Sequence, residues 1–222
     1  MFRALAFCLQ AGTYHVILVE MKGIVLTACV LAACSGDVDS SVSDASDGSG
    51  SGSGSGMADA PGGVGEPANL TGITLYHNQV RQAVDTSGIA AGPLPPMQWD
   101  PDLAALAQAW TSQCKDTDNN GLVDHSSQAY RTNAAGYAYI GENVFGAGGA
   151  ATAQGAVNLW AKEKMNFTYP TGCSGTCGHY TQIVWRTSVN LGCALVDCPG
   201  LQYGGTILCN YGPGGNSGGA PY

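Results

Sequence analysis

Histidine and glutamate are scarce in the later part of this 222-residue chain, so each one is a candidate for acid–base or metal chemistry. Residues 69–222 contain His77, His125, His179, Glu142 and Glu163. Imidazole nitrogens can bind a divalent metal such as zinc, while carboxylates orient the rings or accept a proton. With two imidazoles as strong ligands, a metal would be held more weakly than in a three-ligand catalytic site. No motif marks a serine, threonine or cysteine as a nucleophile.

A second group of candidate ligands lies just before His125. Its oxygen-bearing side chains belong to Asp116, Asp118, Asn120 and Asp124. The spacing Asp-x-Asp-x-Asn-Gly resembles the start of an EF-hand calcium loop, where alternate oxygens converge and glycine permits a sharp turn. Ser127 replaces the glutamate expected at the twelfth position, and Asp124 could supply a later ligand. The segment fits either an ordinary polar turn or a calcium loop, and a bound calcium ion would order the loop that leads to His125.

The cysteines indicate an oxidising compartment. Of nine in the chain, Cys8, Cys29 and Cys34 precede the domain. The other six are Cys114, Cys173, Cys177, Cys193, Cys198 and Cys209. An even number in an exported chain indicates three disulfides, although the sequence alone allows 15 pairings. A structural zinc site is the weaker interpretation, because no two neighbouring cysteines have the spacing of a zinc knuckle and thiolates would oxidise in this compartment.

Three helices are predicted in the first two thirds of the domain. Residues 71–85 place apolar side chains on one side at helical spacing. The second helix begins at Asp100, a good N-cap, followed by Pro101 at the first helical position. The third helix is predicted over residues 152–165.

The last third of the domain is predicted to form strands. Residues 179–186 alternate, which places His179 on one face of a strand and Tyr180 on the other. Residues 191–196 and 206–211 are two further short apolar strands. Helices followed by strands indicate an α+β fold in which helices cover an antiparallel sheet.

Four motifs follow one another along residues 72–222 of the chain. They are His77-Asn78-Gln79-Val80-Arg81, Gly141-Glu142-Asn143-Val144, the segment from Gly178 to Arg186, and the segment from Cys209 to Asn216. In this order they resemble the signatures of the CAP superfamily, which includes plant pathogenesis-related class 1 proteins, insect venom antigen 5 and cysteine-rich secretory proteins. The resemblance implies a three-layer α-β-α sandwich with a mainly antiparallel central sheet, stapled by disulfides.

The resemblance also implies a site and a disulfide pattern. The family's cleft tetrad corresponds to His125, Glu142, Glu163 and His179 in this sequence. The two histidines would hold a zinc-like metal, and Glu142 and Glu163 are the candidate catalytic groups. A hydrogen-bonded network that supports the sheet and helices is the alternative, and His77 is interpreted as a helix-anchoring residue. The plant-type disulfides would join Cys114 to Cys198, Cys173 to Cys177 and Cys193 to Cys209.

The first 68 residues are predicted to target and tether the domain. An apolar run after Met21 ends in Leu-Ala-Ala-Cys34, which resembles a bacterial lipobox and is too short to span a bilayer. Residues 1–34 are therefore interpreted as a signal peptide with a lipobox, with Met21 as a candidate true start and Cys34 as the lipid attachment site. An ordinary signal peptide is the alternative. Residues 35–68, rich in Ser, Gly and Asp, are expected to be a disordered linker to a domain at 69–222.

The net charge and the four motifs together limit the classes of function that this chain can have. The formal net charge is −8, and no Lys/Arg cluster offers a footprint for nucleic acid. We expect a monomeric binding module that is lipid-anchored to the cell envelope, at the outer membrane or surface, or secreted. Its ligand would be a lipid or sterol-like molecule, a peptide or a protein, with a His/Glu cleft able to bind a divalent metal. A metal-assisted hydrolase and a structural cell-surface interaction protein are the alternatives.

Overall fold

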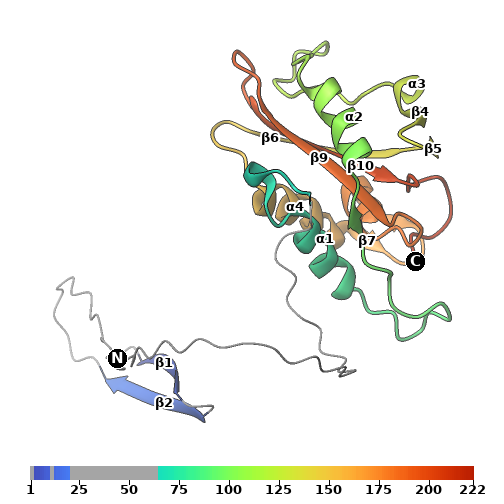
Figure 1. Ribbon diagram of the computed structural model, residues 1–222. Helices are drawn as coiled ribbons and strands as arrows, with labels where there is room; N and C mark the ends of the chain where they lie inside the picture. The colour runs from blue at the N-terminus through green and yellow to red at the C-terminus, as the bar shows by residue number, and fades with distance from the viewer. Residues whose placement is uncertain (1–2, 11–12, 21–64) are drawn as a thin grey trace, which may run out of the picture. The chain divides into compact units, whose positions relative to one another are not determined.

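The computed structural model describes residues 3–10, 13–20 and 65–222 of the chain (Figure 1). The predicted signal peptide after Met21, the predicted lipid attachment site Cys34 and most of the predicted linker lie outside these residues. Two antiparallel strands, β1 (Arg3–Gln10) and β2 (Thr13–Glu20), belong to one compact unit. Residues 65–222 belong to a second unit, which contains the candidate cleft.

Four strands form the central sheet of the second unit, in the order β3-β9-β10-β6. Their bounds are Gln98–Trp99 for β3, Gly141–Ala147 for β6, Asn190–Asp197 for β9 and Gly205–Gly212 for β10. β10 pairs antiparallel with β9 and with β6, while the short β3 pairs parallel with β9. Every residue of β10 is buried, because this strand lies inside the sheet with both faces covered. The sheet is mainly antiparallel, which confirms the predicted class.

Helices cover both faces of this sheet (Figure 1). The bounds are Ile73–Gln82 for α1, Pro101–Thr111 for α2, Gln128–Arg131 for α3, Ala153–Lys162 for α4 and Gly178–Ile183 for α5. On one face, Ala107 of α2 packs against Ala194 and Leu208 of the sheet. On the other face, α1, α4 and α5 surround a larger core that includes Trp160 and Ile207. Successive strand residues point to opposite faces, so β9 and β10 contribute to both cores, and the three-layer sandwich is confirmed.

Side-chain caps begin three of the helices: α2 at Asp100, as predicted, α3 at Ser127 and α4 at Thr152. The Asp100 carboxylate accepts the backbone N–H groups of Asp102 and Leu103 at 2.9 and 3.1 Å. At α4, Thr152 Oγ1 accepts the backbone N–H of Gly155 at 3.1 Å. Such acceptors satisfy backbone donors that have no partner inside the helix. The helices predicted from the sequence are therefore present, with ends shifted by a few residues.

The prediction of a strand over residues 179–186 was wrong, because this segment contains helix α5 and the turn after it. Glu163 Oε2 accepts the backbone N–H groups of His179 and Tyr180, at 2.9 and 3.2 Å, and so satisfies the first turn. The side chains of Tyr180 and Ile183 then face the core at helical spacing. A contact from a distant part of the chain outweighs the local alternation, and Tyr180 does not lie opposite His179 on a strand.

Three disulfides cross-link the domain. They join Cys114 to Cys198, Cys173 to Cys177 and Cys193 to Cys209, which are the pairs that the resemblance implied. The remaining short elements are the 3-10 helices η1 (Ala68–Leu70) and η2 (Glu163–Asn166) and the hairpins β4–β5 (Thr132–Ala134, Tyr137–Tyr139) and β7–β8 (Phe167–Thr168, Gly172–Cys173). Within the described ranges, none of the helices has the length and apolar character needed to cross a membrane.

Candidate functional site

The first half of the candidate site pairs His125, on the loop after α2, with Glu142 of β6. His125 Nδ1 donates to Glu142 Oε1 at 2.7 Å. Glu142 also accepts the backbone N–H of Ser126 at 2.9 Å and the Ser126 hydroxyl at 2.5 Å. Arg131 Nε lies 3.9 Å from Glu142 Oε2. The Glu142 side chain is 1% exposed and that of His125 is 55% exposed, so a buried carboxylate holds one edge of an accessible imidazole ring.

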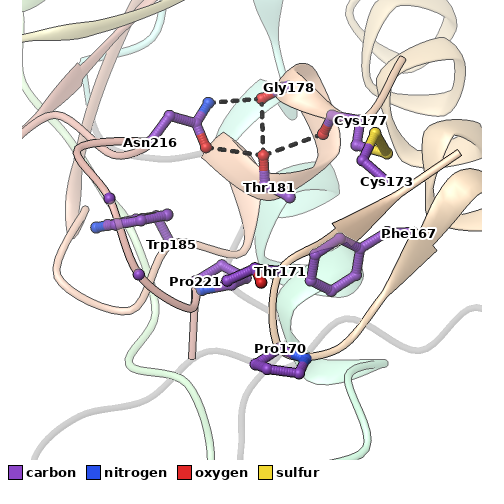
Figure 2. A pocket seen from close by; sticks show the side chains of 12 residues that line it. Phe167, Pro170, Thr171, Cys173, Cys177, Gly178, Thr181, Trp185, Asn216 and Pro221 are labelled. Atoms are coloured by element: carbon purple, nitrogen blue, oxygen red, sulfur yellow. Dashed lines mark hydrogen bonds between the residues drawn. A yellow bond between two sulfur atoms is a disulfide. The ribbon is translucent and has the colours of Figure 1, made fainter. Parts of the chain in front are cut away.

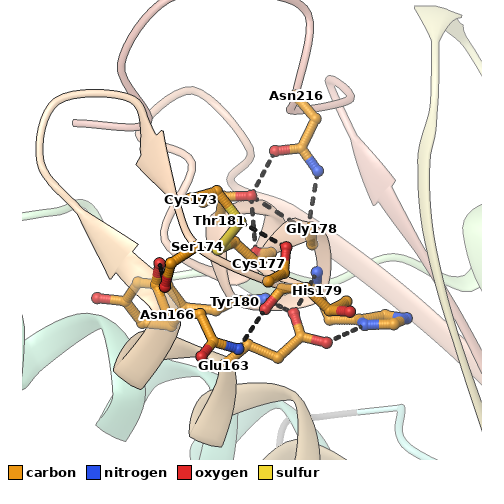
Figure 3. The surroundings of a disulfide bond; sticks show 12 residues. Glu163, Asn166, Cys173, Ser174, Cys177, Gly178, His179, Tyr180, Thr181 and Asn216 are labelled. Atoms are coloured by element: carbon orange, nitrogen blue, oxygen red, sulfur yellow. Dashed lines mark hydrogen bonds and ion pairs between the residues drawn. A yellow bond between two sulfur atoms is a disulfide. The ribbon is translucent and has the colours of Figure 1, made fainter.

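The second half lies at the start of α5 (Figure 3). His179 Nδ1 donates to Glu163 Oε1 at 2.6 Å, while Glu163 Oε2 accepts the N–H groups that open the helix. The His179 ring stacks on Trp160, with ring centroids 6.1 Å apart and 13° between the planes. The Cys173–Cys177 disulfide ends at the N-cap residue of α5. His179 is therefore held at its ring, at its backbone and on one ring face.

Both histidines leave the same ring nitrogen available. An ionised carboxylate can only accept a hydrogen bond, so the proton lies on Nδ1 of His125 and of His179. In the part of the chain that the structure describes, neither Nε2 atom has a hydrogen-bond partner. A carboxylate behind an imidazole fixes the ring orientation and raises its basicity, as it does behind metal-bound histidines. Each pair can thus offer one nitrogen to a metal or accept one proton from a ligand.

Strand β6 connects the two halves through consecutive residues. Glu142 points to the side of His125, and Asn143 points to the other face of the strand. Asn143 Nδ2 donates to the backbone carbonyl of His179 at 3.1 Å and to the Tyr211 hydroxyl at 3.0 Å. The position of each half therefore depends on the same strand.

His77 is buried and supports the site from inside the domain. Its ring, unlike those of His125 and His179, is not accessible. Its Nδ1 donates to the Ile73 carbonyl at 2.7 Å, and its Nε2 accepts the Tyr211 hydroxyl at 2.9 Å. Burial lowers the pKa of His77 from 6.5 to about 4, so the ring is neutral at neutral pH and able to accept. Burial also holds the pKa of Tyr211 well above its usual value, which keeps the donated proton in place. These contacts fit the interpretation of His77 as a residue that anchors α1.

An apolar groove opens beside the His179–Glu163 pair, and we call it the cleft groove. It is lined by Leu122, Val144, Phe145, Gly146, Leu159, Trp160, Glu163, His179 and Tyr203, and its volume is about 270 Å³. At one end Leu122 and Tyr203 lie directly against Gly146, where a Cβ atom would collide with both side chains. The groove thus places apolar surface next to the His179 ring, whose Nε2 has no hydrogen-bond partner among the described residues.

A second groove lies between the β7–β8 hairpin and the C-terminal segment (Figure 2). Its volume is about 290 Å³, and its walls include Phe167, Trp185 and Pro221. Thr181 Oγ1 donates to Asn216 Oδ1 at 2.7 Å, which ties the C-terminal segment to α5. This second groove therefore borders the same helix that carries His179.

The predicted calcium loop brings carboxylates together. One oxygen each of Asp116, Asp118 and Asp124 lie within 4.8 Å of one another. Among the residues with described positions this is the one group of three such ligands, and the His/Glu tetrad does not form another. Asp116 also accepts the backbone N–H groups of Asn120 and Gly121, both at 3.0 Å. A polar turn makes such bonds as well, so calcium binding stays a prediction.

Two partners in the site were not identified from the sequence. Ser126 is 3% exposed and bonds to both oxygens of Glu142, and a serine next to a candidate ligand was the available signal. Asn143 lies inside a recognised motif, but its role depends on the two faces of β6, which the sequence does not display. Among the described residues, His125 and His179 each pair with a glutamate and not with a serine or threonine hydroxyl.

The fold and its cross-links define the class of protein. A sheet between two helical layers, with three disulfides, is a domain suited to an extracytoplasmic compartment. The sequence model of the CAP family, described as the cysteine-rich secretory protein family, matches residues 75–211. The chain belongs to this family, which confirms the resemblance seen in its motifs.

Individual relatives agree with this assignment. Pathogenesis-related protein 1 of Arabidopsis thaliana is 46% identical over 142 residues, which cover 63% of this chain and 73% of that protein. GLIPR1-like protein 1 of Homo sapiens is 38% identical over 144 residues, 63% of this chain and 56% of that protein. The solved structure of Na-ASP-1 aligns with a TM-score of 0.53 at 24% identity, over 74% of this chain and 45% of that one. NaASP2, crystallised with Zn²⁺, aligns with a TM-score of 0.50 at 24% identity, over 68% of this chain and 82% of that one.

Proposed function

We propose that this CAP domain is an extracytoplasmic binding module whose His/Glu cleft holds a divalent metal. The observation that carries the proposal is the pairing of His125 with Glu142 and of His179 with Glu163, at 2.7 and 2.6 Å. Both pairs direct the carboxylate to Nδ1 and leave Nε2 as the ligand atom.

The donor set suits zinc. Neutral imidazole nitrogen is a common zinc ligand, and a carboxylate on the other ring nitrogen fixes the required tautomer. With two protein nitrogens, a four-coordinate ion keeps positions for water or for a ligand. Zinc supplies Lewis acidity at such positions when it is bound. NaASP2 has this fold and was crystallised with Zn²⁺, which makes zinc the first ion to test here.

The hydrogen bonds that Glu142 and Glu163 already accept favour a binding role of the cleft over hydrolysis. Glu142 accepts three hydrogen bonds from His125 and Ser126, and Glu163 accepts three from His179 and Tyr180. A general base needs an oxygen that is free to take a proton from water. In Glu142 and in Glu163, three of the about four lone-pair sites already accept bonds that orient the site. We therefore assign them as positioning residues, and a hydrolase alternative would use imidazole Nε2 as its base.

The test is calorimetric titration of the purified chain with zinc. Wild type should bind, and the double variant His125→Ala/His179→Ala should show no heat. Glu142→Gln and Glu163→Gln keep both rings but change their support, and each should weaken binding by about 10- to 100-fold. Asp102→Asn, at an exposed carboxylate on α2, is the matched control and should bind like wild type. Zinc heat that survives the double histidine change would show that the metal binds elsewhere.

A lipid or sterol-like ligand is assigned to the second groove as part of this proposal. Its walls include Phe167 and Trp185, so the groove offers apolar surface near α5. Thr171→Trp would fill the groove from an exposed position and should abolish binding of a fluorescent sterol. Thr176→Trp makes the same change at an exposed residue that does not line the groove and serves as the control. Equal sterol binding by both variants would remove the groove as the site.

Membrane attachment through Cys34 completes the proposal. The cysteine follows an apolar run in a lipobox-like sequence. Cys34→Ser should abolish incorporation of labelled palmitate and move the protein from the membrane fraction to the soluble fraction. Unchanged labelling of this variant would rule out Cys34 as the attachment site.

A further inference from the structure

The cleft groove runs along the outer edge of the central sheet. Three of its lining residues, Val144, Phe145 and Gly146, belong to β6. β6 is the last strand in the order β3-β9-β10-β6, and within the described ranges it pairs with β10 alone. An edge strand of this kind directs the N–H and C=O groups of every second residue away from the sheet.

Little else bonds to the backbone of this edge. Apart from the pairing with β10, the described residues make one hydrogen bond to the main chain of β6, from Trp160 Nε1 to the Val144 carbonyl at 3.2 Å. The last four residues of the strand, from Val144 to Ala147, are also partly exposed. Trp160 therefore occupies the Val144 carbonyl, and the edge from Phe145 to Ala147 is open to a further strand.

Apolar side chains border this edge. Leu159 on α4 is 52% exposed and Tyr203 is 37% exposed, and both line the groove, so they add apolar surface at its rim. Leu122 lies against Gly146 and belongs to the acidic loop, residues 115–124. The Tyr203 N–H donates to the Gly121 carbonyl at 2.9 Å and so fixes this loop. The groove is thus a formed pocket beside unpaired strand backbone.

We infer that the cleft groove binds an extended peptide, which pairs with the outer edge of β6 and places one large apolar side chain between Leu122, Leu159 and Tyr203. The inference rests on the proposed role of the cleft as a binding surface and names its occupant. A volume of about 270 Å³ lies at the lower end of ligand pockets, so the groove suits a single side chain. Main-chain pairing along a strand edge provides affinity, and the pocket selects the side chain.

Charge favours a basic peptide on the Leu122 side of the groove. The loop that carries Leu122 also carries Asp116, Asp118 and Asp124. Its one basic residue, Lys115, is placed over the Trp110 ring, 4.9 Å from the centroid. Lysine or arginine on either side of the apolar residue would complement these carboxylates when no calcium ion is bound to them.

The test uses the full chain and a capped heptapeptide with central leucine, flanking threonines and a lysine at each end. Binding is followed by amide chemical shifts in EDTA, so that it does not depend on zinc. We expect shifts at Val144–Ala147, and a peptide with central glycine should bind about tenfold or more weakly. N-methylation of alternate peptide amides keeps the leucine but removes strand pairing, and it should abolish binding.

Two variants give a matched comparison. Leu159→Glu places a charge in the groove at an exposed helix position and should abolish peptide binding. Leu75→Glu makes the same change at a residue on α1 that is 40% exposed and outside the groove, and it should bind like wild type. Equal binding of the N-methylated peptide, or no shift in β6 at about 5 mM peptide, would overturn the inference. Zinc titrations of the same preparations report on the metal proposal separately, so either one can fail alone.

Discussion

Acidification should destabilise this domain through His77. The ring is fully buried between α1 and β10, where it donates to Ile73 and accepts from Tyr211. Protonation would turn Nε2 of His77, which accepts the Tyr211 hydroxyl, into a second donor. The resulting charge would lie in a buried site without solvent. Arg81, which is also buried, adds a smaller repulsion of the same sign.

The magnitude follows from the pKa difference between the folded and unfolded chain. Above pH 6.5 the ring is neutral in both states, so the full stability is present. Below pH 6.5 the unfolded chain takes up the proton first, and the free energy of unfolding falls until the folded-state pKa of about 4 is reached. The difference from 6.5 to about 4 corresponds to a loss of about 3 kcal/mol, at about 1.4 kcal/mol per pKa unit.

Urea unfolding followed by tryptophan fluorescence, from pH 7.5 to pH 4 with the disulfides intact, measures this loss. His77→Phe keeps an aromatic ring but cannot titrate, so its stability should fall less steeply below pH 6.5. Its lower stability at pH 7.5 reports the lost hydrogen bonds and packing alone, about 1–3 kcal/mol. His125 and His179 are present in both proteins, so the comparison isolates the change at His77. Identical slopes for wild type and variant would refute the assignment of the depressed pKa to His77.

Three further predictions concern the helix cap, the acidic loop and the support of the site. Asp100→Ala removes the acceptor at the start of α2 and should lower the free energy of unfolding by about 1 kcal/mol, read from the urea midpoint; an unchanged midpoint would contradict a role for the cap. Calcium titration should give heat with wild type and none with Asp116→Asn/Asp118→Asn, and no heat with wild type would leave the loop as a polar turn. Ser126→Ala removes a donor to Glu142 and should weaken zinc binding about tenfold, whereas equal affinity would show that this hydroxyl does not position the site.

Much of the fold could be predicted, because its signals are local or are carried by motifs. Asp100 caps α2 as its sequence position indicates, since capping depends on residues within one turn. The disulfide pairs could not be derived from cysteine spacing and came from the resemblance. The segments 191–196 and 206–211 match β9 and β10, because continuous apolar runs mark buried strands.

The failures have a common physical cause, which is dependence on distant contacts. α5 is a helix because the carboxylate of Glu163 caps it, and alternation in the sequence gives no sign of that contact. β6 was not recognised as a strand, since Gly141 and Gly146 weaken strand propensity and Glu142 and Asn143 are polar although buried. These polar residues are accommodated inside only because each has a specific partner.

The placement of Glu142 and Asn143 next to each other on β6 has a consequence for how the domain tolerates change. The two residues of β6 that contact the two halves of the cleft are neighbours, separated by a rise of about 3.3 Å, and this separation does not depend on the lengths of the surrounding loops. Insertions between residues 115 and 124 can therefore accumulate without altering it. A one-residue slip of β6 against β10 would instead exchange the two faces and dismantle both halves at once. The loops around the cleft can therefore change in length, while the separation of Glu142 and Asn143 along β6 stays the same.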